Sequence, residues 1–141
     1  MATTFQVTFD SADPAALAAF WAEAVHYVLA PPPKGFDSWD AALDAWGVPT
    51  DHRNDRSALV DPEGVGPRIF FQKVPEPKTV KNRVHVDLLA GGGPSVPLDE
   101  QRGRVAAQVA RLESLGATRV DDHADLGVHW AVMRDPEGNE F

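Results

Sequence analysis

Residues 68–89 read RIFFQKVPEPKTVKNRVHVDLL, two apolar stretches joined by a crossing rich in proline and lysine. The stretches Arg68–Val74 and Arg83–Leu89 have the length and the β-branched and aromatic content of strands. Each carries a polar residue within its apolar pattern, Gln72 in the first and His85 in the second. A polar group on a mostly buried strand face needs a partner, which can be water, a hydrogen bond, a metal or a ligand.

The composition is that of a folded protein of one domain, or of two small halves that share one sheet. The chain has 141 residues, of which 43% are hydrophobic and four are tryptophan. A net charge of −8 argues against partners such as nucleic acid or an anionic membrane surface. The absence of cysteine excludes disulfides and thiolate chemistry. Because no apolar run has the length of a membrane span and no signal peptide is evident, we expect a cytoplasmic protein.

The tetrapeptide Asp-Pro-Glu-Gly occurs twice, at Asp61–Gly64 and Asp135–Gly138. It is a strong turn signal, and each copy follows an apolar strand candidate. Going backwards from each copy, the elements match, so the order strand–helix–strand–strand–strand occurs twice. We therefore predict an α+β fold of two βαβββ modules, residues 1–76 and 81–141.

Local signals place three helices. Asp13 and Pro14 form an N-cap and a first helical position. Ser38 can cap a second, shorter helix, and a third runs over 99–115 with an apolar stripe on one face. The second helix carries Trp39 and Trp46 at helical spacing, which is typical of a core but also suits the wall of a ligand cleft.

The duplicated order, the two turns, FFQKVPEPKTVKNRVHVDL and the closing MRDPEGNEF resemble the glyoxalase-like branch of the vicinal oxygen chelate superfamily. Glyoxalase I, extradiol dioxygenases and bleomycin-resistance proteins belong to this superfamily. The resemblance covers essentially the whole chain and is most specific over 70–88. It implies a curled mixed sheet around a shared cleft, with the helices outside. It also implies a small-molecule ligand and a homodimer.

In enzymes of this superfamily a divalent metal lies in the cleft, with ligands from the first and last strands of each module. The resemblance assigns these positions to Gln6, His85 and Gln72. The fourth falls just after Phe141, so we expect an incomplete last strand, with Glu140 as the substitute ligand on the same face. The ion would be zinc, nickel, manganese or iron. Two amides and one imidazole form a weak donor set, so the alternative without any metal stays open.

The predicted ligand-binding cleft comprises Gln6, Gln72, His85, Asp87, Trp39 and Trp46. In the alternative interpretation, His85 hydrogen-bonds to Asp87 or to the backbone, and the two glutamine side chains hydrogen-bond to each other. His129 and Trp130 are neighbours on one strand, so we expect only one of them to face the cleft. A basic patch is formed by Lys78, Lys81 and Arg83. It is either part of a solvated crossing between the modules or an anchor for a substrate carboxylate or phosphate.

Three functions follow from the resemblance. The first is a lyase or isomerase acting on a small oxygenated compound, with a metal polarising an oxygen while a base moves a proton. No residue identifies that base, and the catalytic residues are unknown. The alternative is a protein that sequesters a small molecule without chemistry, as bleomycin-resistance proteins do. The third, an iron dioxygenase, needs two histidines and a carboxylate, which the sequence does not supply.

Overall fold

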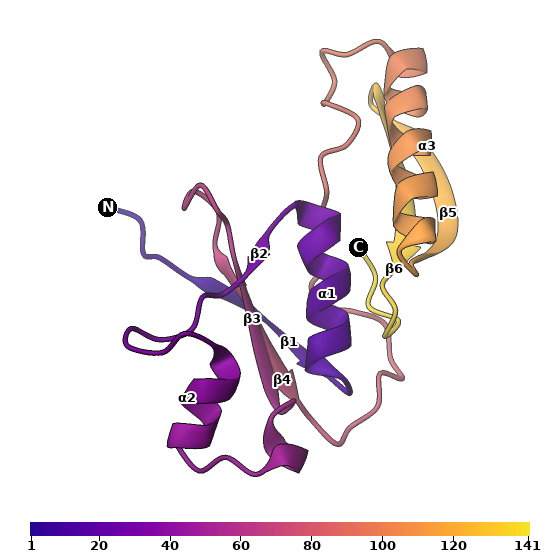
Figure 1. Ribbon diagram of the computed structural model, residues 1–141. Helices are drawn as coiled ribbons and strands as arrows, with labels where there is room; N and C mark the ends of the chain where they lie inside the picture. The colour runs from indigo at the N-terminus through magenta and orange to yellow at the C-terminus, as the bar shows by residue number, and fades with distance from the viewer. The chain divides into compact units, whose positions relative to one another are not determined.

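The computed structural model describes residues 1–141, which form two compact units, unit 1 (Met1–Pro77) and unit 2 (Lys78–Phe141). The predicted α+β class is confirmed, with three α-helices, a four-stranded mixed sheet in unit 1 and a two-stranded antiparallel sheet in unit 2 (Figure 1). The two sheets are separate and do not close into a barrel. None of the helices combines the length and apolar character that crossing a bilayer requires.

Unit 1 has the predicted βαβββ order, with a short helical insertion before its third strand. Its sheet order is β1-β4-β3-β2, with β1 parallel to β4 and the other pairs antiparallel. The sheet therefore has β1 and β2 as its edge strands. Its elements are β1 (Gln6–Ser11), α1 (Pro14–Val25), β2 (Val28–Leu29), α2 (Trp39–Ala45), the 3-10 turn η1 (Thr50–His52), β3 (Arg56–Val60) and β4 (Arg68–Lys73).

Helix α1 covers one face of this sheet and buries the core of unit 1. It begins as predicted, because the Asp13 carboxylate accepts a hydrogen bond from the Ala16 N–H at 3.2 Å. The Phe9 ring lies 5.1 Å from that of Trp21 and 5.4 Å from that of Phe71. Trp21 and Phe71 are fully buried. The aromatic contacts between helix and sheet therefore fix which strand face remains available for a site.

Unit 2 consists of α3 (Leu98–Ser114), β5 (Thr118–Asp125) and β6 (Val128–Arg134). Helix α3 packs on β6 through a buried stripe made of Val105, Val109 and Leu112. Gln101 lies on the same stripe and is fully buried. Its amide nitrogen donates to the Val96 and Gly127 carbonyls at 2.8 Å, and its oxygen accepts from the His129 N–H at 2.9 Å. One side chain thus joins the helix to a loop, a turn and a strand.

The strand predicted over Arg83–Leu89 is not formed. Its equivalent in unit 1, β1, has β4 as its partner, the strand that follows the first Asp-Pro-Glu-Gly turn. After the second turn, residues 139–141 pair with β6 through reciprocal backbone hydrogen bonds between Met133 and Phe141. No strand of unit 2 runs along 83–89. Without a neighbouring strand, backbone groups there lack the ladder that stabilises an extended conformation.

Both Asp-Pro-Glu-Gly segments form turns closed by their aspartate. Asp61 accepts from the N–H groups of Glu63 and Gly66 at 2.9 and 2.7 Å. Asp135 accepts from the N–H groups of Glu137 and Asn139 at 3.0 and 2.9 Å. The hydrogen bonds from the backbone, that of Gly66 foremost, lower the pKa of Asp61. The two turns are therefore structural, as the repeat predicts.

Candidate functional site

The sheet of unit 1 has an open face on the side opposite α1. Residues in register across a sheet share a face, so two rows of side chains can be read from the strand pairing. One row contains Asp10, Gln72 and Arg56, and the row four residues away along β4 contains Gln6 and Arg68. All five of these residues are exposed. These two rows are polar and carry two arginines, and the row between them contains Thr8, Phe70 and Ala58.

The register separates the two glutamines. Gln6 lies opposite Arg68 and Gln72 opposite Asp10, so they are four residues, roughly 13 Å, apart along the strands. Each has its own partner: the Arg68 guanidinium donates to Gln6 Oε1 at 2.9 Å, and Gln72 Nε2 donates to Asp10 Oδ1 at 2.7 Å. The predicted hydrogen bond between the two glutamines is not made.

The two tryptophans of the α2 segment have structural partners. The Trp39 indole N–H donates to the Ala30 carbonyl at 2.7 Å, which joins α2 to the end of β2. Trp46 is 54% exposed, so it is not a core residue, and its ring packs edge-on against Phe36 at 5.8 Å. Arg53 holds the same helix through ion pairs with Asp40 and Asp44. The insertion is thus fixed by contacts of its own.

Unit 2 contains a cavity of about 720 Å³. The apolar face of α3, the strand β6 and the segment 87–93 form most of its wall. Trp130 and His129 are both among the residues that line it. Polar groups are fewer than apolar ones, and His85, Asp87, Lys81 and Glu140 are among them. The volume and the lining are those of a small-molecule site.

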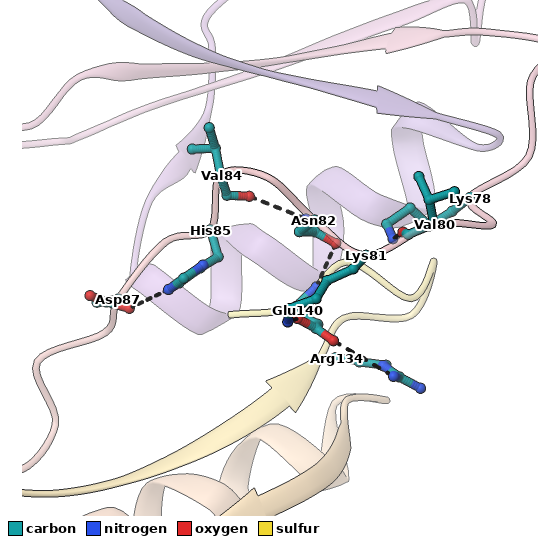
Figure 2. A network of polar contacts seen from close by, with 9 residues as sticks. All are labelled: Lys78, Val80, Lys81, Asn82, Val84, His85, Asp87, Arg134 and Glu140. Atoms are coloured by element: carbon teal, nitrogen blue, oxygen red, sulfur yellow. Dashed lines mark hydrogen bonds and ion pairs between the residues drawn. The ribbon is translucent and has the colours of Figure 1, made fainter. Parts of the chain in front are cut away.

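A network of polar contacts holds one wall of the cavity, and Figure 2 shows its members. The Glu140 carboxylate lies between Lys81, with which it makes a hydrogen bond, and Arg134, whose guanidinium is 3.7 Å away. Asn82 Oδ1 accepts from the Glu140 N–H at 3.2 Å, and its amide nitrogen donates to the Val84 carbonyl at 3.3 Å. The hydrogen bond from Lys81 lowers the pKa of Glu140. Glu140 therefore joins residues 81 and 82 to the segment that follows the second Asp-Pro-Glu-Gly turn.

His85 and Asp87 form a pair at the cavity. The His85 Nε2 atom is 3.5 Å from Asp87 Oδ1, within ion-pair distance (Figure 2). Both side chains are more than half exposed. Asp87 is the partner named in the alternative interpretation, but no hydrogen bond joins the two side chains. An imidazole beside a carboxylate is also the usual arrangement of a general base.

The residues that the resemblance assigned to a metal do not form a donor set within either unit. In unit 1, Gln6 and Gln72 lie in different rows and each already has a hydrogen-bond partner. In unit 2, the Glu140 carboxylate is held by two cations and His85 by an aspartate. No group of three or more histidine, aspartate or glutamate side chains is arranged to hold a metal. Within each unit taken by itself, the donors present therefore do not form a site for a divalent ion.

The sequence profile of the glyoxalase-like domain matches residues 6–141, nearly the whole chain. The chain belongs to the glyoxalase-like domain family. Proteins of this family often bind divalent metals and small-molecule substrates, and often form dimers. No curated protein matches this glyoxalase-like sequence.

Structures of known proteins support the same fold. The chain is similar to the oxidase ChaP-H2, with a TM-score of 0.55, 13% identity and coverage of 99% of this chain and 90% of that one. It is similar to a glyoxalase/bleomycin resistance protein/dioxygenase family enzyme from Burkholderia phytofirmans PsJN, with a TM-score of 0.53, 17% identity and coverage of 96% and 92%. It is also similar to a lactoylglutathione lyase from Agrobacterium tumefaciens, with a TM-score of 0.51, 12% identity and coverage of 99% of this chain and 90% of that one. At these identities the likeness shows the glyoxalase-like fold.

The sequence patterns do not single out Arg68 on the unit 1 sheet or Gln101, the buried residue that braces α3 in unit 2. Arg68 is the first residue of a predicted strand, and a cation that opens an apolar strand indicates an exposed strand face. Gln101 lies four residues before Val105 on the apolar stripe of α3, so its helical position marked it as a buried polar group. Both signals are local and were available in the sequence.

Proposed function

We propose that the protein binds a small, largely apolar molecule in the cavity of unit 2. The observation that carries this proposal is the cavity itself, about 720 Å³ with a mostly apolar wall. Ligand sites of this kind are usually concave and apolar, with a few polar groups that orient the ligand. Val105, Val109 and Trp130 supply apolar surface, and the pair His85 and Asp87 supplies polar atoms at the same cavity. This is the function of a sequestering protein.

A second candidate is an isomerase or lyase reaction in the same cavity, and the His85–Asp87 pair favours it. Asp87 would hold the imidazole in one orientation, and the free imidazole nitrogen would take a proton from a carbon next to a carbonyl. The dioxygenase alternative needs two histidines and a carboxylate that converge, and neither unit brings such a set together.

A neutral fluorescent probe, N-phenyl-1-naphthylamine, tests the binding proposal. Ala131 lines the cavity, so Ala131→Phe fills part of it and should raise the dissociation constant of the probe at least about tenfold. Ala110→Phe, on the exposed face of α3, adds the same ring outside the cavity and should leave the constant unchanged. Equal constants for the two variants, with unchanged melting temperatures, would contradict the proposal.

The variant His85→Asn separates the two candidates. A sequestering protein should keep its affinity for the probe, since the apolar wall is intact. An isomerase or lyase should lose proton exchange at the carbon of a bound ketone, measured by NMR in deuterated water, while the probe still binds. Wild-type protein that exchanges no such proton above the rate in buffer would rule out the catalytic candidate.

We also infer, from the family, that the two units act as the two modules of a single glyoxalase-like domain and that the protein is a cytoplasmic homodimer. Apolar side chains that are largely exposed, such as Phe5, Val84 and Leu89, support further burial in an assembly. Sedimentation equilibrium should give twice the chain mass of 15.3 kDa. A mass that stays at the monomer value across the concentration range would contradict the dimer.

A further inference from the structure

Arg68 has an unusual position on the open face of the unit 1 sheet. It is exposed at the start of β4, and one of its terminal nitrogens donates to Gln6 Oε1 at 2.9 Å. Its guanidinium carbon lies 5.1 Å from the centroid of the Phe70 ring, on the same face two residues along. A hydrogen bond at one side and an aromatic ring below hold the group in place. This reduces the side-chain entropy that binding a ligand would remove.

Arg68 also lacks the acidic partner that most arginines of this protein have. No carboxylate lies within ion-pair distance of it, although the chain has 21 acidic residues against 13 basic ones. The nearest carboxylate in the strand register is that of Asp10, four positions along β1 from Gln6, and it accepts from Gln72. Arginines with ion pairs include Arg53 with Asp40 and Asp44, Arg102 with Asp99, Arg104 with Glu100, Arg119 with Asp122, and Arg134 with Glu140.

The donors that remain on Arg68 suit one class of ligand. A guanidinium has five N–H donors in a planar fork, and Gln6 uses one of them. The Phe70 ring, 5.1 Å away, takes none of the other donors, which leaves an edge of the fork free. A planar carboxylate can accept two parallel hydrogen bonds from such an edge. Because Gln6 accepts through its oxygen, it does not compete for the negative ligand.

We propose that Arg68, positioned by Gln6 and Phe70, binds the carboxylate of a small organic acid on the open face of the unit 1 sheet. The site does not depend on the cavity of unit 2, because all three residues belong to β1 and β4. A single guanidinium matches the single charge of a carboxylate. A phosphate dianion shares the same oxygen chemistry, and the test therefore includes it as a separate arm.

The proposal is tested by NMR titration of the whole chain with benzoate. The Arg68 Nε–H and Gln6 amide signals should shift and saturate, whereas benzamide, which has the same ring without the charge, should shift neither. Arg68→Lys keeps the charge but removes the fork, and should weaken benzoate binding at least about tenfold. Gln6→Leu removes the orienting acceptor and should weaken it about threefold.

Arg102→Lys is the matched control, since Arg102 is an exposed arginine on α3 that is already paired with Asp99. It should bind benzoate as the wild type does, and so should Ala131→Phe, which separates this site from the unit 2 cavity. Equal shifts with benzoate and benzamide, or an unchanged constant in Arg68→Lys with an unchanged melting temperature, would overturn the proposal. Tighter binding of inorganic phosphate than of benzoate at the Arg68 signals would overturn the carboxylate assignment.

Discussion

The two units begin from the same sequence plan and end in different states. Unit 1 pairs β1 with β4 over six residues in register, and its core is closed by α1. Unit 2 keeps the helix, the hairpin and the turn, but its segment 83–89 has no strand partner. The Asn82 side chain holds that segment instead, because it donates to the Val84 carbonyl and accepts from the Glu140 N–H. The difference shows that a repeated pattern of apolar residues specifies a strand only where a neighbouring strand completes its hydrogen bonds.

This difference determines where each unit offers a site. In unit 1 the aromatic core fills the space between helix and sheet, so the remaining polar groups lie on the exposed face. In unit 2 the space beside α3 and β6 is a cavity, and apolar side chains such as Val84 and Leu89 are 82% and 89% exposed. Unit 1, whose core is filled, is the closed unit and offers a site only on its exposed surface. Unit 2 is the open unit and offers a site in its cavity.

Removing an aromatic ring from the core of unit 1 should produce the largest loss of stability. Phe71 is fully buried and stacks on Phe9, so Phe71→Ala should lower the free energy of unfolding by about 3–5 kcal/mol. Urea unfolding followed by circular dichroism measures it. Val65→Ala, at a side chain that is 85% exposed, is the control and should change it by less than about 0.5 kcal/mol. Similar values for both variants would mean that unit 1 is not the closed unit.

In unit 2, the buried residue whose loss should destabilise the protein most is polar, the Gln101 amide. Gln101→Leu keeps the side-chain size but leaves the Val96 and Gly127 carbonyls and the His129 N–H without their partner. The free energy of unfolding should fall by about 2–4 kcal/mol, since unpaired buried groups are costly. Gln108→Leu, on the same helix and partly exposed, should be nearly neutral. If the two leucine variants unfold alike, the three hydrogen bonds do not hold unit 2 together.

The next largest loss of stability is expected at Gly66, just after the first Asp-Pro-Glu-Gly turn. A Cβ at Gly66 would lie 1.8 Å from the Tyr27 Oη atom, so Gly66→Ala should destabilise the protein by about 1–3 kcal/mol. Thermal unfolding measures the change. The double variant Tyr27→Phe with Gly66→Ala should recover part of the loss, because it removes the atom that clashes. No recovery would place the strain elsewhere in the turn.

A smaller effect is expected from pH in unit 2. The hydrogen bond from Lys81 lowers the pKa of Glu140 in the folded state. The pair therefore stabilises the protein above the unfolded-state pKa, and the contribution is lost as pH falls through the folded-state pKa. Glu140→Gln should remove this part of the acid dependence of the melting temperature. An identical acid profile in the variant would contradict the role of the pair.

The opposite sign is expected in unit 1, with the smallest effect. The hydrogen bond with Asp55 raises the pKa of the exposed His52. Its stabilisation is present below the unfolded-state pKa and is lost as pH rises through the folded-state value. His52→Asn should flatten the melting temperature between weakly acidic and alkaline pH. A variant that keeps the wild-type slope would assign that slope to another group.

Local chemistry made much of the fold predictable. Asp13 and Ser38 cap their helices as expected because an N-cap depends only on residues within one turn. The α+β class followed from the repeat for the same reason, since turns and amphipathic helices are local patterns. The unpaired segment 83–89 could not be predicted in this way, because its alternation is the same whether or not another strand lies beside it.

The candidate site was less predictable, since it depends on register. Spacing made Gln6 and Gln72 look equivalent, but the pairing of β1 with β4 places them in different rows, with Arg68 and Asp10 as their partners. His85 and Asp87 lie close together as expected, because they are only two residues apart. Pairings between residues distant in sequence follow from strand register, which a single sequence does not fix.

Hydrogen exchange of the backbone amides with and without N-phenyl-1-naphthylamine tests the contrast between the two units most directly. Without the probe, the β1 and β4 amides should exchange slowly and those of 83–89 quickly, since only the former are paired. With the probe, protection should increase over β6 and the segment 87–93, and remain unchanged over β1 and β4. Protection that rises in unit 1 alone, or slow exchange over 83–89 in the free protein, would contradict the account of a closed unit and an open, ligand-binding one.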